Sequence, residues 1–499
     1  MPRLGLEKEL VDASVYANTV QRFRERRIAL PTFAQLADPS LIPDNVRAAL
    51  GPVGPDDASP LNLFRVQWYN DASRTGFQDV PAYVELPKSL TGVDARIVVA
   101  LGDRFPMIAA HKVLAAYGCL APRIITGQFD PTHHLAVWPS TGNYCRGGVA
   151  ISRIMACRGV AVLPEGMSQE RFDWLERWVV DSSDIIRTPG TESNVKEIYD
   201  KCDELSVDPE NVIFNQFSEF GNHIVHYLAT GRALEHVFRT MQAREPGLRL
   251  RAFTSATGSA GTIAAGDYLK EHQGSLTVAI EALECPTLIE NGFGEHNIQG
   301  IGDKHIPLIH NVMATDVALA LSDRATDRLN VLFNTPVGRA YLAERRGVPA
   351  ATLDALSSFG LSSIANVLGA IKTAKYYEMG PDDVIVTVAT DGAAMYHSER
   401  DIAFGKYFGG AFDAVAASEV FGEHILGTTT DHLLELSRKD RERIFNLGYY
   451  TWVEQQGVSI EEFRARKDPA FWTQMRAIAA DWDPMIEEFN SRTGVLESL

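Results

Sequence analysis

The stretch Asp383-Val384-Ile385-Val386-Thr387-Val388-Ala389 is almost wholly apolar and rich in β-branched residues, and Thr390-Asp391-Gly392-Ala393 follows it directly. Such a run predicts a strand buried on both faces, as strands of parallel sheets are. Similar runs occur upstream, separated mostly by stretches with helical periodicity. They lie at residues 96–100, 135–138, 160–163, 184–187, 212–215, 250–254 and 276–282. Because strands alternate with helices, the sequence predicts an α/β fold with open, mostly parallel twisted sheets flanked by helices.

The composition narrows the class of protein. The chain has 499 residues, of which 47 are Lys or Arg and 64 are Asp or Glu, giving a formal net charge of −17. So acidic a chain binds a phosphate backbone poorly, and we expect no nucleic-acid partner. No apolar run reaches the ~18 residues that a membrane span needs, and Met1–Glu9 has no apolar signal core. We therefore expect no membrane association and a cytoplasmic location.

The cysteines agree with that location. Their number is odd, and no two of them form a CxxC pair. Free thiols of this kind are typical of a reducing compartment and form neither a disulfide framework nor a zinc site. The sequence therefore predicts no metal site. The five cysteines are Cys119, Cys145, Cys157, Cys202 and Cys285.

Open parallel sheets bind ligands at the carboxyl ends of their strands, so the loops that follow strands are the places to look for chemistry. Pro139-Ser140-Thr141-Gly142-Asn143-Tyr144 follows the strand that ends at Trp138 and precedes a helix. Unpaired amides at the start of that helix could bind a carboxylate or another anion. Simple N-capping by Ser140 or Thr141 would explain the same residues.

A second loop, Ser255-Ala256-Thr257-Gly258-Ser259-Ala260-Gly261-Thr262, contains nothing larger than Thr. A backbone this open can approach a ligand closely, and its amides and hydroxyls favour phosphate binding at the helix start. No Lys follows the last Gly, so it is not a P-loop, and it lacks the G-x-G-x-x-G spacing. A tight strand-to-helix turn is the alternative.

Two further features concern single side chains. Thr390 and Asp391 follow the most apolar strand and could face the same crevice, although Asp391 could instead cap a helix. Lys112 lies in Ala109-Ala110-His111-Lys112-Val113-Leu114-Ala115, among small and apolar neighbours. Burial there would lower the pKa of the amine and favour imine chemistry. Most lysines, however, are solvated surface residues.

The order of these signals along the chain is more specific than any one of them. The order of lysine, Ser/Thr-Gly-Asn loop, small-residue loop and polar residue after the last strand resembles that of the fold-type II pyridoxal-phosphate enzymes, the cysteine synthase family. Residues 159–171 resemble the family's G-x-x-x-x-x-x-P-x-x-M-S-x-E-R stretch, and Ile298-Gln299-Gly300-Ile301-Gly302 its I-Q-G-I-G. Asn215-Gln216-Phe217, followed by Asn222, His226, Thr230 and Gly231, has the family's spacing too. The matching segments run from about Ser59 to Ser398.

The resemblance implies the cofactor pyridoxal 5'-phosphate and a role for each matched residue. Lys112 would form the Schiff base with the cofactor and later move the α-proton. Ser140, Thr141, Gly142 and Tyr144 would bind the substrate carboxylate with help from Gln216, and Asn143 would contact the cofactor's phenolic oxygen. Gly258, Ser259, Ala260, Gly261 and Thr262 would hold the phosphate. Thr390 or Asp391 would face the pyridine nitrogen, since a register shift of one residue leaves both open; we favour Thr390.

The resemblance also implies a tryptophan synthase β-like arrangement with helical extensions. We expect residues 1–95 to be an N-terminal extension and the first part of the large domain. Residues 96–220 would form the smaller domain with the substrate loop and the lysine. Residues 221–420 would form the larger, phosphate-binding domain, and residues 421–499 a helical tail without strands. Residues 315–361 read as a helical insert.

The resulting prediction is an enzyme acting on an amino acid by β-elimination or β-replacement, as a homodimer. A pyridoxal-phosphate ammonia-lyase, racemase or thiolase is the alternative. A non-catalytic scaffold that kept the fold is a third reading, because a fold does not fix a function. The sequence does not name the substrate.

Overall fold

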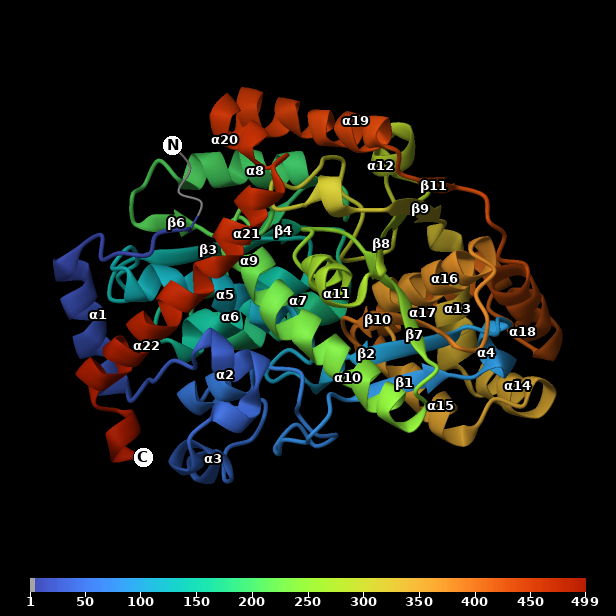
Figure 1. The fold of residues 1–499 in the computed structure, drawn as a ribbon, viewed down its shortest axis with the longest axis horizontal. Coiled ribbons are helices and arrows are strands. Elements are labelled where there is room, and N and C mark those ends of the chain that lie inside the picture. Colours follow the sequence, from blue (N-terminus) through green and yellow to red (C-terminus); the bar gives the residue numbers. More distant parts are fainter. Residues whose placement is uncertain (1–4) are drawn as a thin grey trace.

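The computed structural model describes residues 5–499, and within them eleven strands form two sheets. Every strand run predicted above overlaps an observed strand, and the predicted fold class is confirmed. Figure 1 shows the two sheets side by side with helices around them. Among residues 5–499, no helix combines the length and apolar character that crossing a bilayer requires.

The larger sheet has seven strands. Its five inner strands run parallel, and an antiparallel strand closes each edge. In spatial order the strands are β1 (Tyr83–Leu86), β2 (Arg96–Leu101), β10 (Asp383–Ala389), β7 (Arg249–Ala256), β8 (Leu276–Ala282), β9 (Val317–Leu321) and β11 (Leu433–Glu435).

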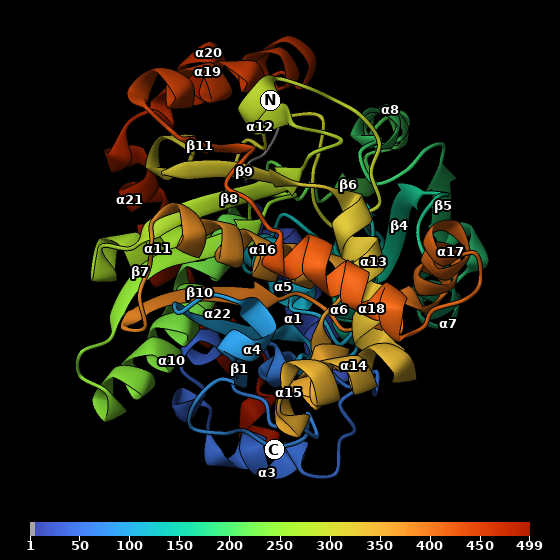
Figure 2. The same cartoon turned by 90° about the vertical axis from the view of Figure 1, so that its right-hand side faces the viewer.

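Strand β10 lies inside this sheet, which explains its apolar sequence. Val384, Val386 and Val388 belong to one hydrophobic core, whereas Ile385 and Ala389 belong to the other. Side chains alternate between the faces of a strand, so both faces of the sheet are covered. Helix α16 (Leu361–Tyr376) packs along β10 and β7 on one face, where Figure 2 shows it crossing the strands. Helices α10 (Gly231–Arg244) and α11 (Ala264–Gln273) cover the other face.

The smaller sheet consists of four parallel strands. In spatial order they are β5 (Ile185–Thr188), β4 (Arg158–Pro164), β3 (Leu135–Pro139) and β6 (Asn211–Ile213). Helices α6 (Asn143–Ile154) and α8 (Val195–Leu205) pack on it. Helix α5 (Lys112–Ile125) packs against α6 and α9 (Phe220–Val225). It therefore begins near the seam between the two sheets.

The remaining helices cover the outside of this core. Helix α7 (Gln169–Trp178) lies near the smaller sheet. Helices α4 (Lys88–Thr91) and α12 (Thr287–Glu290) are single turns. The others beside the larger sheet are α13 (Asp323–Asn334), α14 (Pro336–Arg346), α15 (Ala350–Ala355), α17 (His397–Phe408) and α18 (Ala414–Phe421).

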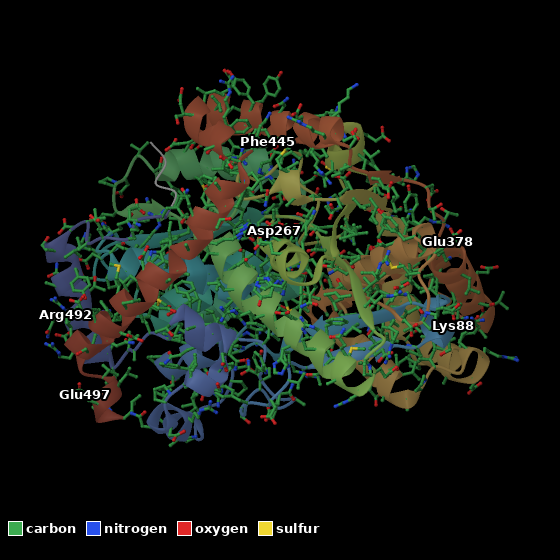
Figure 3. The ribbon with its side chains drawn as sticks, viewed as in Figure 1. Lys88, Asp267, Glu378, Phe445, Arg492 and Glu497 are labelled. Atoms are coloured by element: carbon green, nitrogen blue, oxygen red, sulfur yellow. The ribbon has the colours of Figure 1, made fainter. Side chains whose placement is uncertain are left out.

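The two ends of the chain pack on each other. The N-terminal segment forms α1 (Ala13–Arg26), α2 (Phe33–Ala37) and α3 (Asp44–Leu50), and the tail forms α19 (Arg438–Tyr449), α20 (Ile460–Ala465), α21 (Pro469–Ala477) and α22 (Ala479–Thr493). Figure 1 shows α22 passing beside α1 and α2, which it contacts. In the tail, Arg476 forms a buried ion pair with Asp267 of α11, which Figure 3 labels near the centre of the molecule.

Three strands lie where the sequence predicted none. Strand β1 lies in the N-terminal segment, β9 opens the expected helical insert, and β11 lies in the tail that was expected to lack strands. Strand β11 has only three residues, which are too few to show a strand pattern in the sequence. It forms a strand because it pairs with β9. Strand β2 belongs to the larger sheet, although residues 96–220 were expected to form the smaller domain. The other domain boundaries stay a prediction.

Candidate active site

A cavity lies where the carboxyl ends of β3, β7 and β10 approach one another, which joins loops from both sheets. Of the predicted site residues, all except Gly142 and Asp391 line it. The lining residues are Lys112, Ser140, Thr141, Asn143, Tyr144, Gln216, Phe217, Ser255, Ala256, Thr257, Gly258, Ser259, Ala260, Gly261, Thr262, Ile263, Gly300, Ile301, Asp303, Ser362 and Thr390.

Lys112 is the one cation among these lining residues of the described chain. It is the first residue of α5, and its Nζ donates a hydrogen bond to Ser259 Oγ at 3.3 Å. Burial lowers the pKa of this amine to about 8, while the nearby Asp303 and Glu192 oppose the fall. A large share of Lys112 is therefore neutral near pH 8, the form that attacks a carbonyl carbon. Lys304, a lysine near the I-Q-G-I-G motif, is exposed and does not line the cavity.

The small-residue loop leads from β7 toward α11 with little room for larger side chains. A Cβ on Gly258 would lie 2.7 Å from the Gly300 carbonyl oxygen, and one on Gly261 would collide with Asn222 Oδ1. Ala260 adopts a left-handed backbone with φ of 63°, a conformation that favours glycine. No side chain caps α11. Its first three amides, at Ala264, Ala265 and Gly266, donate to the carbonyls of residues 261–263. The loop amides that precede them are therefore the ones available to an anion.

A histidine that the sequence analysis passed over supports both the lysine and this loop. His111 Nε2 and Thr262 Oγ1 are hydrogen-bonded at 2.9 Å. The ring stacks on Trp68 at 5.4 Å between centroids. Burial lowers the pKa of His111 to about 3, so the ring is neutral. Trp68 in turn donates to Thr230 Oγ1, which is also hydrogen-bonded to His226 Nδ1. The matched residues His226 and Thr230 thus pack behind Lys112 rather than in the cavity.

The Ser140–Tyr144 loop leads from β3 into α6 without a capping side chain. Gly142 is the N-cap residue of α6 and makes no side-chain cap bond, so capping by Ser140 or Thr141 is wrong as an explanation of these residues. Ser140 Oγ instead accepts from the Gly142 amide at 2.9 Å. A Cβ on Gly142 would lie 2.6 Å from Arg171 Nε, so this position has no room for a larger side chain.

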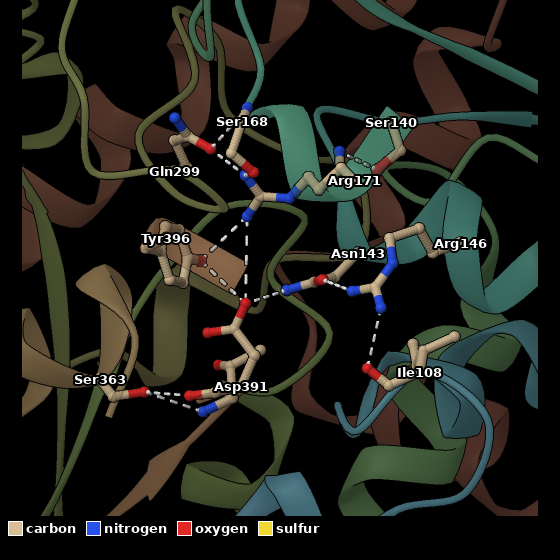
Figure 4. Close-up of polar contacts among 12 residues, drawn as sticks. Ile108, Ser140, Asn143, Arg146, Ser168, Arg171, Gln299, Ser363, Asp391 and Tyr396 are labelled. Carbon is tan, nitrogen blue, oxygen red and sulfur yellow. Dashed lines mark hydrogen bonds and ion pairs between the residues drawn. The ribbon is translucent and has the colours of Figure 1, made fainter. Parts of the chain in front are cut away.

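Thr390 and Asp391 are adjacent but lie in different surroundings. Thr390 lines the cavity, and its amide donates to Ser363 Oγ at 3.2 Å. Asp391 points away into a buried polar network, shown in Figure 4. It does not cap a helix, because Gly392 is the N-cap residue of the helical turn that follows and makes no cap bond. The sequence reading of Asp391 as a helix cap is therefore wrong.

The network around Asp391 consists of charged and polar side chains that hydrogen-bond to one another, although Asp391 Oδ1 has no partner (Figure 4). Asp391 Oδ2 accepts from Asn143 Nδ2 at 2.7 Å and from the Tyr396 hydroxyl at 2.8 Å, and Arg171 Nη2 lies 4.0 Å away. Burial raises the pKa of Asp391, and Arg171 is the strongest of the groups that oppose the rise. Asn143 Oδ1 accepts from Arg146 Nη1 at 2.9 Å. The network fixes Asn143 at the cavity wall.

Sequence reasoning missed two acidic residues and one serine near Lys112. Asp303 lines the cavity, and Glu192 lies beside it in the loop between β5 and α8. Both could have been found, since Glu192 follows a predicted strand and Asp303 follows the I-Q-G-I-G motif directly. Ser362 lies in the first turn of α16, which precedes β10, so a search of loops after strands overlooks it. Within residues 5–499, no three His, Cys, Asp or Glu side chains are grouped to hold a metal ion.

Known proteins include chains that are similar to this one in sequence and in fold. No protein-family model matches the sequence. Cysteine synthase B of Campylobacter jejuni is 30% identical over 260 residues, which cover 50% of this chain and 76% of that protein. The cysteine synthase of Staphylococcus aureus is 28% identical over 267 residues, covering 52% and 75%. Among solved structures, O-acetyl serine sulfhydrylase isoform 3 of Entamoeba histolytica aligns with a TM-score of 0.54 and 22% identity, covering 70% of this chain and 94% of that one.

Proposed function

The chain belongs to the cysteine synthase family of fold-type II pyridoxal-phosphate enzymes, and from that premise we propose that it replaces the β-substituent of an amino acid with a thiol. β-Elimination is the competing outcome on the same site. One observation carries the proposal: Lys112 Nζ, the one cation that residues 5–499 place in the cavity wall, lies 3.3 Å from Ser259 Oγ in the small-residue loop.

The residues around Lys112 fit pyridoxal phosphate, the cofactor of this family. The Gly258–Thr262 loop presents amides and hydroxyls next to a buried amine, and Thr257 Oγ1 beside it is buried without a partner. A Cβ on Gly258 or Gly261 would meet Gly300 or Asn222, so the loop keeps its open backbone only with glycine at these positions. When bound, the cofactor supplies an aldehyde carbon and an electron sink.

The roles of the protein groups follow from their positions. Lys112 holds or releases one proton at Nζ, which its lowered pKa of about 8 makes possible near neutral pH. The first amides of α6, after Ser140 and Thr141, bind the substrate carboxylate together with Gln216. Thr390 presents a neutral hydroxyl to the ring nitrogen. Asp391 acts on the site only through Asn143.

The proposed reaction balances without an added oxidant or reductant. With O-acetyl-L-serine, the thiol sulfur forms a bond to the β-carbon and the bond from that carbon to the acetate oxygen breaks. The thiol proton leaves with the acetate. If water rather than thiol enters, the same loss of acetate leads to pyruvate and ammonia.

Reductive trapping tests the assignment of Lys112. After borohydride reduction, mass spectrometry should find the pyridoxyl group on the peptide that contains Lys112. Lys112→Ala should lose that label and at least a thousandfold of thioether formation from O-acetyl-L-serine, by the scale of lost covalent catalysis. The exposed Lys304→Ala is the matched control and should keep both. A label on another lysine would overturn the assignment.

We further propose that the enzyme is a cytoplasmic homodimer. All five cysteines are buried free thiols, which supports a reducing compartment. Of the tail aromatics, Trp452 is buried against its own chain, and the exposed Tyr450 is the one available to a second copy of the chain. Light scattering on the full chain measures the mass, and a monomer would contradict the dimer.

A further inference from the structure

Two carboxyl groups in the wall near Lys112 lack the hydrogen bonds that buried acids normally make. Glu192 is 1% exposed, and neither of its oxygens has a partner; Asp303 is 7% exposed, and its Oδ2 has none. Burial raises the pKa of Glu192 to about 8 and that of Asp303 to about 7. The Thr141 hydroxyl and the Gly300 amide favour the charged form of Glu192 from nearby, but neither makes a hydrogen bond of standard geometry.

The two residues are held in place by their backbones. Thr287 Oγ1 donates to the Asp303 carbonyl at 3.0 Å. Three residues further along the same loop, the Ile306 carbonyl accepts from Trp452 Nε1 of the tail at 2.7 Å. Beside Glu192, Ser193 Oγ donates to the Gly294 carbonyl at 2.7 Å. Unpaired acids on an anchored backbone cannot relax toward solvent, so their missing partners point to a ligand.

The nearby cations do not satisfy these acids. Arg171 moderates the pKa of Glu192, but its guanidinium is hydrogen-bonded to Ser168, Gln299 and Tyr396. Lys112 moderates the pKa of Asp303, yet its hydrogen bond goes to Ser259. Three acceptor atoms, the two of Glu192 and Oδ2 of Asp303, thus have no hydrogen bond of standard geometry, although the Thr141 hydroxyl and the Gly300 amide lie near Glu192. A ligand ammonium group brings three N–H donors and the opposite charge, which matches both requirements.

We propose that Glu192 and Asp303 form a subsite for an ammonium group carried by the substituent that enters or leaves at the β-carbon. This inference rests on the proposed function. The α-amino group of the amino acid is committed to the position of Lys112, and its carboxylate to the amides of α6. The ammonium group facing the acids must therefore belong to the thiol nucleophile or to the leaving group, so the favoured partner is an aminothiol or the thioether formed from one.

An open hollow of about 570 Å³ borders the two loops that carry these acids. Ser193 and Lys304, the chain neighbours of the two acids, line it between α8 and the turn at residues 450–455. Its other charged lining residues are Glu197, Asp200, Asp203 and Lys196, which forms an ion pair with Asp200.

Two thiols of equal length test the subsite, since cysteamine ends in an ammonium group and 2-mercaptoethanol in a hydroxyl. The measured quantity is the ratio of their kcat/KM values with O-acetyl-L-serine, taken in the wild type and in Asp303→Asn, Glu192→Gln and the double variant. Comparing ratios between variants cancels the different reactivities of the two thiols. We expect the ratio to fall about tenfold in each single variant and further in the double variant. The exposed Asp382→Asn, just before the start of β10, is the matched control and should keep the wild-type ratio.

A second arm distinguishes the entering group from the leaving group. S-(2-aminoethyl)-L-cysteine and S-(2-hydroxyethyl)-L-cysteine are offered as first substrates, and the same change of ratio is expected if the leaving group also uses the subsite. A third arm needs no turnover: borohydride-reduced holoenzyme should bind cysteamine at least tenfold more tightly than 2-mercaptoethanol in calorimetry, and Asp303→Asn should remove that preference.

The outcomes separate the two proposals. If no thiol yields a thioether, the proposed function fails, while calorimetry still reports on the subsite. If thioethers form but the ratio is the same in wild type and double variant, and the reduced enzyme binds both thiols equally, the subsite is overturned.

Discussion

Two buried acidic regions border the same cavity, and they differ in what surrounds them. Asp391 Oδ2 accepts hydrogen bonds from Asn143 and Tyr396, and Arg171 lies 4.0 Å away (Figure 4). Asp391 Oδ1 has no partner, but no hydrogen bond of standard geometry reaches either oxygen of Glu192 or Oδ2 of Asp303. The regions therefore differ in whether the carboxylate has any donor at all. Burial raises the pKa in both regions, so burial alone does not separate them.

We interpret Asp391 as an acid that stabilises the fold, and Glu192 and Asp303 as acids whose partner is a bound ligand. Removing a partnered buried charge leaves its partners uncompensated, which is costly. Removing a buried acid that has no hydrogen-bond partner removes its desolvation cost, which no interaction within the chain offsets. Substitutions in the two regions should therefore change stability in opposite directions, although the acids lie around one cavity.

The largest expected effect is on the partnered region. Asp391→Ala should destabilise the protein by about 3–5 kcal/mol, because Arg171 loses its buried counter-charge and Asn143 loses an acceptor. The melting temperature of the holoenzyme measures this. Asp303→Ala, the matched change in the other region, should leave the melting temperature equal or raise it. Equal losses in both variants would break the comparison.

The pH dependence of stability sharpens the comparison. The pKa of Glu192 rises from 4.5 to about 8 on folding, and that of Asp303 from 3.8 to about 7. The folded state then holds more protons than the unfolded state across this window, so stability falls as pH rises from about 4 to 8. Glu192→Gln and Asp303→Asn should flatten that fall, measured as melting temperature against pH. Of the facing groups, Arg171 stays charged throughout, whereas the pKa of Lys112 falls further in the variants because both acids raise it in the wild type. An unchanged slope would contradict unpaired burial.

A smaller effect concerns the tail. Trp452→Phe keeps the aromatic packing but loses the donor to the Ile306 carbonyl, which should cost about 1 kcal/mol. Because that carbonyl belongs to the loop of Asp303, the preference for cysteamine over 2-mercaptoethanol should fall about threefold, by the same energy scale. Trp178→Phe, at the end of α7, is the control for replacing a tryptophan elsewhere in the chain. A stability loss without any change of preference would show that the tail does not position Asp303.

The smallest effect is expected where neither region is touched. Ala260→Gly relieves a left-handed backbone but frees the unfolded chain, so the two terms nearly cancel within about 1 kcal/mol. Cofactor affinity should stay within about twofold of the wild type by the same estimate. Gly261→Ala is the contrasting change, since its Cβ collides with Asn222, and it should weaken cofactor retention at least tenfold.

Much of the fold and the cavity could be predicted from the sequence because both depend on local patterns. The apolar run at 383–389 reads as a buried strand, and the loops after β7 and β10 meet because these strands are parallel neighbours. The loop after β3 belongs to the smaller sheet, so its place at the cavity depends on how the two sheets pack. Strand β9 was missed because Val317-Ala318-Leu319-Ala320-Leu321 suits a helix as well, and its strand form comes from its neighbours β8 and β11.

The surroundings of the buried acids could not be predicted from the sequence. Asp391 was read as a possible helix cap or ring contact, and only the folded chain brings Arg171, Asn143 and Tyr396 around it. For Glu192 and Asp303 the informative property is the absence of a partner, which no sequence pattern encodes. A residue's type is local, whereas its lack of hydrogen bonds depends on every segment that packs near it.

A crystal structure of the holoenzyme with S-(2-aminoethyl)-L-cysteine tests the central claim most directly. The account predicts that the ligand's terminal nitrogen lies within hydrogen-bonding distance, about 3 Å, of both Glu192 and Asp303, while the Asp391 network stays as in Figure 4. A terminal nitrogen that points into solvent, with both carboxyl groups still without a partner, would contradict it.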